Sequence, residues 1–239
     1  MYRVEQISKN YGKLKVFDRF SLEFPEQRIT VILGPSGCGK TTLLNVLAGL
    51  TKVTAGRVVT TTEVSYLFQE PRLLPWLTVR GNLSLVLQDK MAKALVTDRV
   101  EQYLATMGLE EYRDFYPAQL SGGLRQRVAL ARAFLYPARL LLMDEPFKSL
   151  DLKVRLGLLD DFLAIWRQEP RTVVAVTHDL KEAVRLGDQL VVLSEKPARV
   201  VKTITTGSVG KNLSEHQRLL IEAELRETLL HYRQAETVQ

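Results

Sequence analysis

Apolar residues follow three different patterns in the first part of the chain. Over residues 2–7 and 16–24 they alternate with polar residues, which is typical of antiparallel strands with one exposed face. Residues 28–33 are almost continuously apolar, and after a glycine-rich segment a helical spacing follows over residues 43–48. The pattern predicts two half-exposed strands, then a buried strand, a sharp turn and a helix. Residues 55–59 and 64–68 predict two further short strands.

The spacing of apolar residues changes again in the middle of the chain. Residues 79–107 and 124–134 carry apolar side chains at helical spacing, with no strand pattern between them. Residues 140–144 and 171–176 are continuous apolar runs, typical of parallel strands buried on both faces. A strand pair over 189–193 and 199–204 and an amphipathic helix over 213–232 complete the pattern. An α/β fold is predicted, with an antiparallel β subdomain near its start and an α-helical insertion.

Composition narrows the class of protein. The chain has 239 residues, of which 46% are apolar and 25% charged, as in ordinary globular proteins. Cys38 is the only cysteine, which rules out a disulfide framework. No run approaches the ~20 apolar residues that cross a bilayer. The net charge is +6, but basic residues are mixed with acidic ones, so we expect a solvated surface and no nucleic-acid partner.

Residues 34–42 match the phosphate-binding pattern G-x-x-x-x-G-K-[ST] between a strand and a helix. Its glycines allow a turn whose N–H groups face an anion, and the helix start adds unpaired N–H groups. Lys40 supplies a charge for the β- and γ-phosphates, and the Thr41 hydroxyl is a ligand for Mg²⁺. The predicted nucleotide-binding residues are Gly34, Pro35, Ser36, Gly37, Cys38, Gly39, Lys40, Thr41 and Thr42.

Polar side chains follow both buried runs. Asp144 and Glu145 end the first run, and His178 follows the second. In open α/β sheets ligands lie beyond the carboxyl ends of the strands, which is where these side chains are expected. We predict that Asp144 joins the Mg²⁺ shell, that Glu145 polarises an attacking water, and that His178 contacts the γ-phosphate or that water.

Three further segments have a structural and a functional interpretation. Ser121-Gly122-Gly123 caps a helix, and it is also a second anion-binding helix start. Tyr11 covers a core edge from a turn, or offers its ring to an adenine. The apolar connector around Trp76 and Leu77 either folds onto the core or forms a docking surface.

With these motifs in this order, the chain resembles the ATP-binding subunit of an ABC transporter. The resemblance implies a P-loop NTPase (RecA-like) core in a single ABC ATPase domain. In this division the core with the β subdomain covers residues 1–70 and 135–210. The helical subdomain covers residues 71–134, and a helical tail covers residues 211–239. It implies that Tyr11 stacks on adenine. By the same resemblance, Gln69 matches the Q-loop glutamine at the catalytic Mg²⁺/water site, Glu145 the general base and His178 the switch histidine. Ser149, Leu150 and Asp151 match the D-loop.

The same resemblance implies partners. Two subunits would sandwich two ATP molecules, with Ser121, Gly122 and Gly123 acting in trans on the nucleotide of the other chain. The segment that includes Trp76 and Leu77 is similar to that of nitrate, sulfonate and taurine importers, and some relatives of this kind handle vitamin precursors. The expected partners are integral membrane permease subunits, which Trp76 and Leu77 would contact, and indirectly a solute-binding protein. The expected location is the cytoplasmic face of the cell membrane.

Two departures and one alternative class remain. Lys148 stands where such importers usually have a small residue, and we expect it to affect the local backbone and dimer contact rather than the chemistry. Leu124 replaces the usual Gln or Met after Ser-Gly-Gly, which a backbone-based phosphate contact tolerates. The alternative is a nucleic-acid-linked ABC ATPase of the repair or chromosome type. That class needs a long coiled-coil insertion, and the chain shows no sustained heptads.

Overall fold

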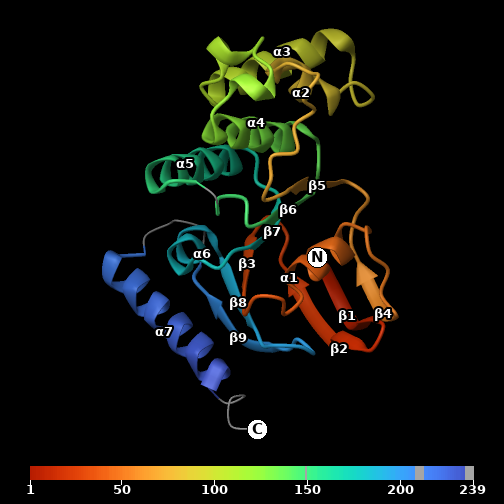
Figure 1. Ribbon diagram of the computed structural model, residues 1–239, viewed down its shortest axis with the longest axis vertical. Helices are drawn as coiled ribbons and strands as arrows, with labels where there is room; N and C mark the ends of the chain where they lie inside the picture. Colours follow the sequence, from red (N-terminus) through yellow and green to blue (C-terminus); the bar gives the residue numbers. More distant parts are fainter. Residues whose placement is uncertain (149, 208–212, 235–239) are drawn as a thin grey trace.

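The computed structural model describes residues 1–148, 150–207 and 213–234, and its core is a six-stranded sheet (Figure 1). The strand order is β5-β6-β7-β3-β8-β9, with neighbouring strands parallel except for the antiparallel pair β8 and β9. The predicted α/β class is therefore confirmed. The strands are β3 (Ile29–Leu33), β5 (Val64–Leu67), β6 (Leu140–Asp144), β7 (Thr172–Val176), β8 (Gln189–Leu193) and β9 (Val200–Thr205).

A second sheet has three antiparallel strands in the order β2-β1-β4. They are β1 (Tyr2–Tyr11), β2 (Leu14–Phe24) and β4 (Ala55–Val59). β1 and β2 extend further than the alternating pattern predicts, because the hairpin closes tightly through Gly12 at a φ of 58°. This places Tyr11 at the last position of β1, opposite Leu14.

Two apolar cores lie on opposite faces of the six-stranded sheet, because successive strand residues point to opposite sides. Along β6, Leu141 and Met143 belong to one core and Leu140 and Leu142 to the other. Helix α1 (Lys40–Leu47) lies between the two sheets (Figure 1). The helices along the other face are α5 (Leu152–Gln168), α6 (Leu180–Leu186) and α7 (Glu215–Gln234).

The remaining helices gather at one end of the long axis (Figure 1). They are α2 (Val79–Leu85), α3 (Lys93–Thr106), the 3₁₀ turns η1 (Glu110–Tyr112) and η2 (Pro117–Gln119), and α4 (Gly122–Leu135). The continuous helical pattern predicted over 79–107 is thus two helices, interrupted at the polar residues 88–90. Among the described residues, no helix is both long and apolar enough to span a bilayer.

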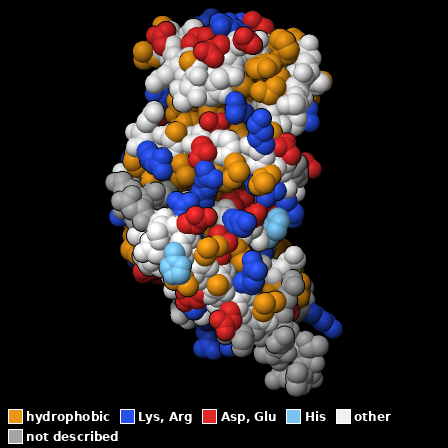
Figure 2. Space-filling view, turned by 90° about the vertical axis from the view of Figure 1, so that its left-hand side faces the viewer, with side chains coloured by type: hydrophobic (Ala, Val, Ile, Leu, Met, Phe, Trp, Pro, Cys, Tyr) orange, Lys and Arg blue, Asp and Glu red, His pale blue; other side chains and the backbone are white. Residues whose placement is uncertain are grey.

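Charged side chains of both signs are mixed along the face shown in Figure 2. Blue Lys and Arg side chains alternate with red Asp and Glu side chains over the helical end and over the sheet end. This face therefore matches the solvated mixed surface expected from the sequence.

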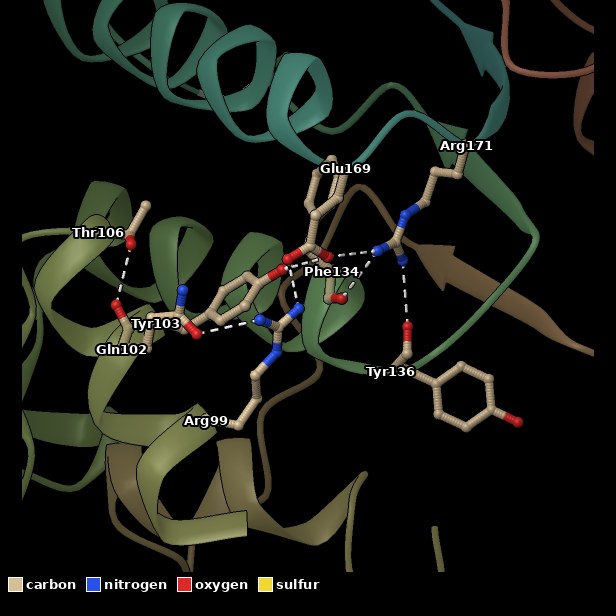
Figure 3. Close-up of polar contacts among 8 residues, drawn as sticks. All are labelled: Arg99, Gln102, Tyr103, Thr106, Phe134, Tyr136, Glu169 and Arg171. Atoms are coloured by element: carbon tan, nitrogen blue, oxygen red, sulfur yellow. Dashed lines mark hydrogen bonds and ion pairs between the residues drawn. The ribbon is translucent and has the colours of Figure 1, made fainter. Parts of the chain in front are cut away.

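One carboxylate links the helical end to the sheet (Figure 3). Glu169, which follows α5, pairs with Arg99 of α3 and accepts a hydrogen bond from the Tyr103 hydroxyl at 3.0 Å. The Arg171 guanidinium reaches the same carboxylate at 3.2 Å and also donates to the carbonyl oxygen of Phe134 at the end of α4. Glu169 therefore joins α3 to the segment that leads into β7.

Candidate nucleotide site

The loop between β3 and α1 has the backbone geometry of a phosphate cradle. Gly37 and Gly39 have φ values of 79° and 120°, in the region that favours glycine. A Cβ atom on Gly39 would lie 2.6 Å from Cγ1 of Val16, so the loop packs directly on β2. No side chain among the described residues caps α1. The N–H groups of its first turn are therefore available to an anion.

Lys40 is buried and its ammonium closes the loop. It donates to the carbonyl oxygens of Gly34 and Pro35, both at 2.8 Å. Both bonds are to neutral acceptors, so a phosphate arriving at the loop offers the ammonium a stronger, charge-assisted partner. Cys38 lies beside it with 2% of its surface exposed, and burial raises the pKa of its thiol although the charge of Lys40 opposes this.

The end of β6 brings oxygen donors to the same place. Burial raises the pKa of Asp144, while a hydrogen bond with the Thr41 hydroxyl and the charge of Lys40 act in the opposite direction. The Tyr66 hydroxyl, which donates to Oδ1 of Asn45 at 3.4 Å, also acts to lower the pKa of Asp144. A hydroxyl in contact with a carboxylate is a donor set that suits Mg²⁺. Thr41 and Asp144 therefore fit the predicted metal site.

Glu145 sits in a strained turn directly after β6. Its φ is 46°, a left-handed conformation that costs a non-glycine residue about 1–2 kcal/mol. Its N–H donates to the carbonyl oxygen of Val176 at 2.9 Å, which holds the turn against β7. Strain of this kind is found at functional sites.

Two basic side chains meet the Glu145 carboxylate at the same oxygen. Nζ of Lys148 lies 2.6 Å and Nδ1 of His178 3.2 Å from Oε2. Burial alone would raise the pKa of Glu145, but the hydrogen bonds and charges of Lys148 and His178 outweigh it and the pKa is lowered. Lys148 therefore contacts the carboxylate of the predicted general base, because the turn after Glu145 directs its side chain back onto it; whether it affects the chemistry stays a prediction.

These groups line a cavity of about 450 Å³. The part of the cavity wall that comes from α7 was not predicted from the sequence. That helix is amphipathic in sequence, but nothing in its pattern indicates that it reaches the phosphate loop. The lining residues are Leu33, Gly34, Pro35, Ser36, Lys40, Glu145, Lys148, His178, Leu180, Arg226, Leu229 and Leu230.

The residues predicted to act in trans lie elsewhere. Ser121 accepts a hydrogen bond from the N–H of Leu124 at 3.3 Å, which confirms that it caps α4. A Cβ atom on Gly123 would lie 2.6 Å from Cγ1 of Val154 on α5, so the start of α4 packs closely on α5. Ser121, Gly122 and Gly123 do not line the cavity of their own chain.

The D-loop is described only in part. Asp151 caps α5 by accepting from the N–H of Val154 at 3.1 Å, and Leu150 is half-buried. Ser149 lies outside the described residues. Gln69 is exposed just beyond β5, and Tyr11 is 50% exposed at the tip of the β1–β2 hairpin. The roles of these residues stay predictions.

The connector before α2, which contains Trp76 and Leu77, is fixed by hydrogen bonds to a buried side chain of α2. Asn82 is fully buried, and its amide accepts from the N–H of Leu74 and donates to the carbonyl oxygens of Leu74, Leu77 and Thr78. Trp76, by contrast, has 69% of its surface exposed. The connector is therefore a fixed loop that presents an aromatic ring to solvent.

Comparisons with known proteins point to one family. Residues 17–148 match the family model described as ABC transporter. An aliphatic sulfonates import ATP-binding protein, SsuB, of Bacillus cereus is 38% identical over 207 residues, which cover 82% of this chain and 81% of the relative. An uncharacterized ABC transporter ATP-binding protein of Methanocaldococcus jannaschii is 39% identical over 215 residues, covering 84% and 80%.

Solved structures show the same likeness. The dimeric structure of a post-hydrolysis state of an ATP-binding cassette bound to ADP and Pi has a TM-score of 0.75 and 28% identity, and the match covers 89% of this chain and all of that one. The dimeric structure of a bacterial ABC transporter cassette matches with the same TM-score, identity and coverage.

Proposed function

Because the chain belongs to the ABC transporter family of ATP-hydrolysing cassettes, we propose that it is the subunit that powers an importer of a small solute. The observation that carries this proposal is the convergence of the phosphate loop, Glu145 and His178 on one cavity. The relatives, whose names include sulfonate import, support a nitrate-, sulfonate- or taurine-like molecule or a vitamin precursor as the solute.

Residues that line the cavity, together with Thr41, Asp144 and Gln69 outside its lining, would each have a role in ATP hydrolysis. Lys40 and the loop N–H groups bind the β- and γ-phosphates. Thr41, Asp144 and Gln69 would hold Mg²⁺, which when bound would neutralise phosphate charge. The Glu145 carboxylate accepts a proton from water, the water oxygen bonds to the γ-phosphorus, and the bond to the ADP oxygen breaks with its electron pair. His178 holds Glu145 in place and faces the γ-phosphate.

A second copy of the chain would complete the site. Ser121, Gly122 and Gly123 offer an exposed helix start but do not line their own chain's cavity, and the two solved relatives are dimeric. In a head-to-tail dimer that helix start would face the γ-phosphate bound by the other chain. ATP then favours the closed dimer, and hydrolysis releases it.

The connector would couple this cycle to a membrane permease. An exposed Trp on a fixed loop is a typical anchor for a partner, since its large ring buries apolar area at little entropic cost. Trp76 and Leu77 would contact the permease subunits at the cytoplasmic face of the membrane. A solute-binding protein would act from the other side of the membrane.

The test is the oligomeric mass of Glu145→Gln with and without MgATP, measured by light scattering. The amide keeps the shape of the side chain but accepts no proton, so the variant should bind ATP, lose nearly all turnover and become a dimer only with ATP. Ser121→Arg in the Glu145→Gln background should bind ATP and stay monomeric. Turnover at the wild-type rate in Glu145→Gln would reject the general-base role. An ATP-dependent dimer of the double variant would remove the helix start from the interface.

A further inference from the structure

We propose that Lys148 is a positioning residue that fixes one oxygen of the Glu145 carboxylate so that the other oxygen faces the attacking water. The inference rests on the proposed role of Glu145 as general base. It adds a residue to the site that neither the motifs nor the family comparison assigns.

The geometry of the carboxylate carries the inference. Among the described residues, every hydrogen bond and ion pair found for the Glu145 side chain ends on Oε2. The two donors come from different elements, since Lys148 follows Glu145 in the turn and His178 follows β7. Two donors on one oxygen fix the carboxylate plane, whereas His178 alone leaves it free to pivot. Oε1 is left for water.

The backbone explains why position 148 can reach this oxygen. The left-handed turn at Glu145 brings the N–H of Lys148 to the carbonyl oxygen of Glu145 at 3.3 Å. Nζ of Lys148 then lies 2.6 Å from Oε2 of Glu145. The Glu145 side chain is 17% exposed. A charge-assisted contact of this length in a partly buried site is a firm restraint. A small residue at position 148 would leave this contact unmade.

A competing role for Lys148 is a direct contact with the γ-phosphate, because it lines the same cavity as Lys40. The two roles differ in what they change. A positioning residue acts on the chemical step and leaves nucleotide affinity unchanged, whereas a phosphate ligand contributes to affinity.

The experiment compares Lys148→Met, Lys148→Arg and the exposed control Lys153→Met. For each variant kcat and KM for ATP are measured, and Kd is measured separately with a fluorescent ATP analogue. We expect Lys148→Met to lower kcat about ten- to a hundredfold, the range that a small misplacement of a reacting group produces, with Kd unchanged. Lys148→Arg should recover most of the rate. Lys153→Met should match the wild type.

A double variant separates positioning from a structural effect. Because Lys148 acts through Glu145, adding Lys148→Met to Glu145→Gln should cause no further loss in single-turnover hydrolysis. A further loss, a rise in Kd of about tenfold, or a kcat at or above the wild-type value in Lys148→Met would each overturn the inference. Wild-type turnover in Glu145→Gln would instead overturn the proposed function of Glu145, so the two failures are distinguishable.

Discussion

Glu182 makes the stability of this protein depend on pH, and replacing it with Gln tests the reasoning. Glu182 lies in α6, four residues after His178, with 5% of its surface exposed. Burial, together with the charge of Asp179, raises its pKa from 4.5 to about 7, although the Thr177 hydroxyl and Arg155 act in the opposite direction. At a pH between these two pKa values, Glu182 holds a proton in the folded protein that it has released in the unfolded chain.

The sign and size of the effect follow from this difference. The free energy of unfolding falls with rising pH wherever the folded state binds more protons than the unfolded chain. The contribution of Glu182 to stability is therefore lost as the pH rises from about 4.5 to about 7, and above that pH it no longer changes. One pKa unit corresponds to about 1.4 kcal/mol, so the full loss is about 3 kcal/mol. Gln resembles the protonated acid at every pH. Glu182→Gln should therefore equal the wild type near pH 4.5 and exceed it by up to about 3 kcal/mol at pH 8.

Urea unfolding followed by circular dichroism, repeated between pH 4.5 and 8, measures this difference. Glu227→Gln on α7 is a suitable control, because it replaces an exposed carboxylate with the same amide. The control should show no pH-dependent gain over the wild type. A difference between Glu182→Gln and the wild type that is constant across the range would refute the linkage argument.

Two further predictions concern the loop contacts. Gly39→Ala should destabilise the protein by about 2 kcal/mol or more in thermal unfolding, because the added Cβ would lie 2.6 Å from Cγ1 of Val16. Gly37→Ala should lower the stability less, because Gly37 also has a positive φ but its added Cβ would meet no atom within 4 Å. Trp76→Ala should leave the ATPase rate of the isolated subunit unchanged but release the subunit from membranes during fractionation. Leu95→Ala, which removes a comparably exposed side chain, should keep it bound, and equal release of both would exclude Trp76 as the anchor.

Local patterns predicted most of the core strands. Continuous apolar runs mark β6 and β7 because both faces of these strands are buried, and the chemical groups follow directly at their ends. The cap at Ser121 was also predictable, because it depends only on residues within three positions of each other.

The remaining features depend on contacts between distant segments or on a backbone conformation that the residue type does not favour. β4 pairs with β1 rather than with its neighbour β5, and a period-two pattern does not encode that choice. The contact of Lys148 with Glu145 depends on the φ of 46° at Glu145, which the residue type does not favour. The part that Arg226 and Leu229 of α7 play in the cavity wall likewise comes from packing over the whole sheet.

The Glu169 junction has a consequence for how such a cassette could be retuned during evolution. Arg99, Tyr103 and Arg171 all converge on that one carboxylate, so this polar link between the helical end and the sheet depends on a single codon. A one-step change there, to Gln or Asp, would loosen or shorten the joint while every side chain of the nucleotide cavity stayed the same. Lineages that pair with different membrane proteins could in this way adjust mechanical transmission without altering their catalytic groups.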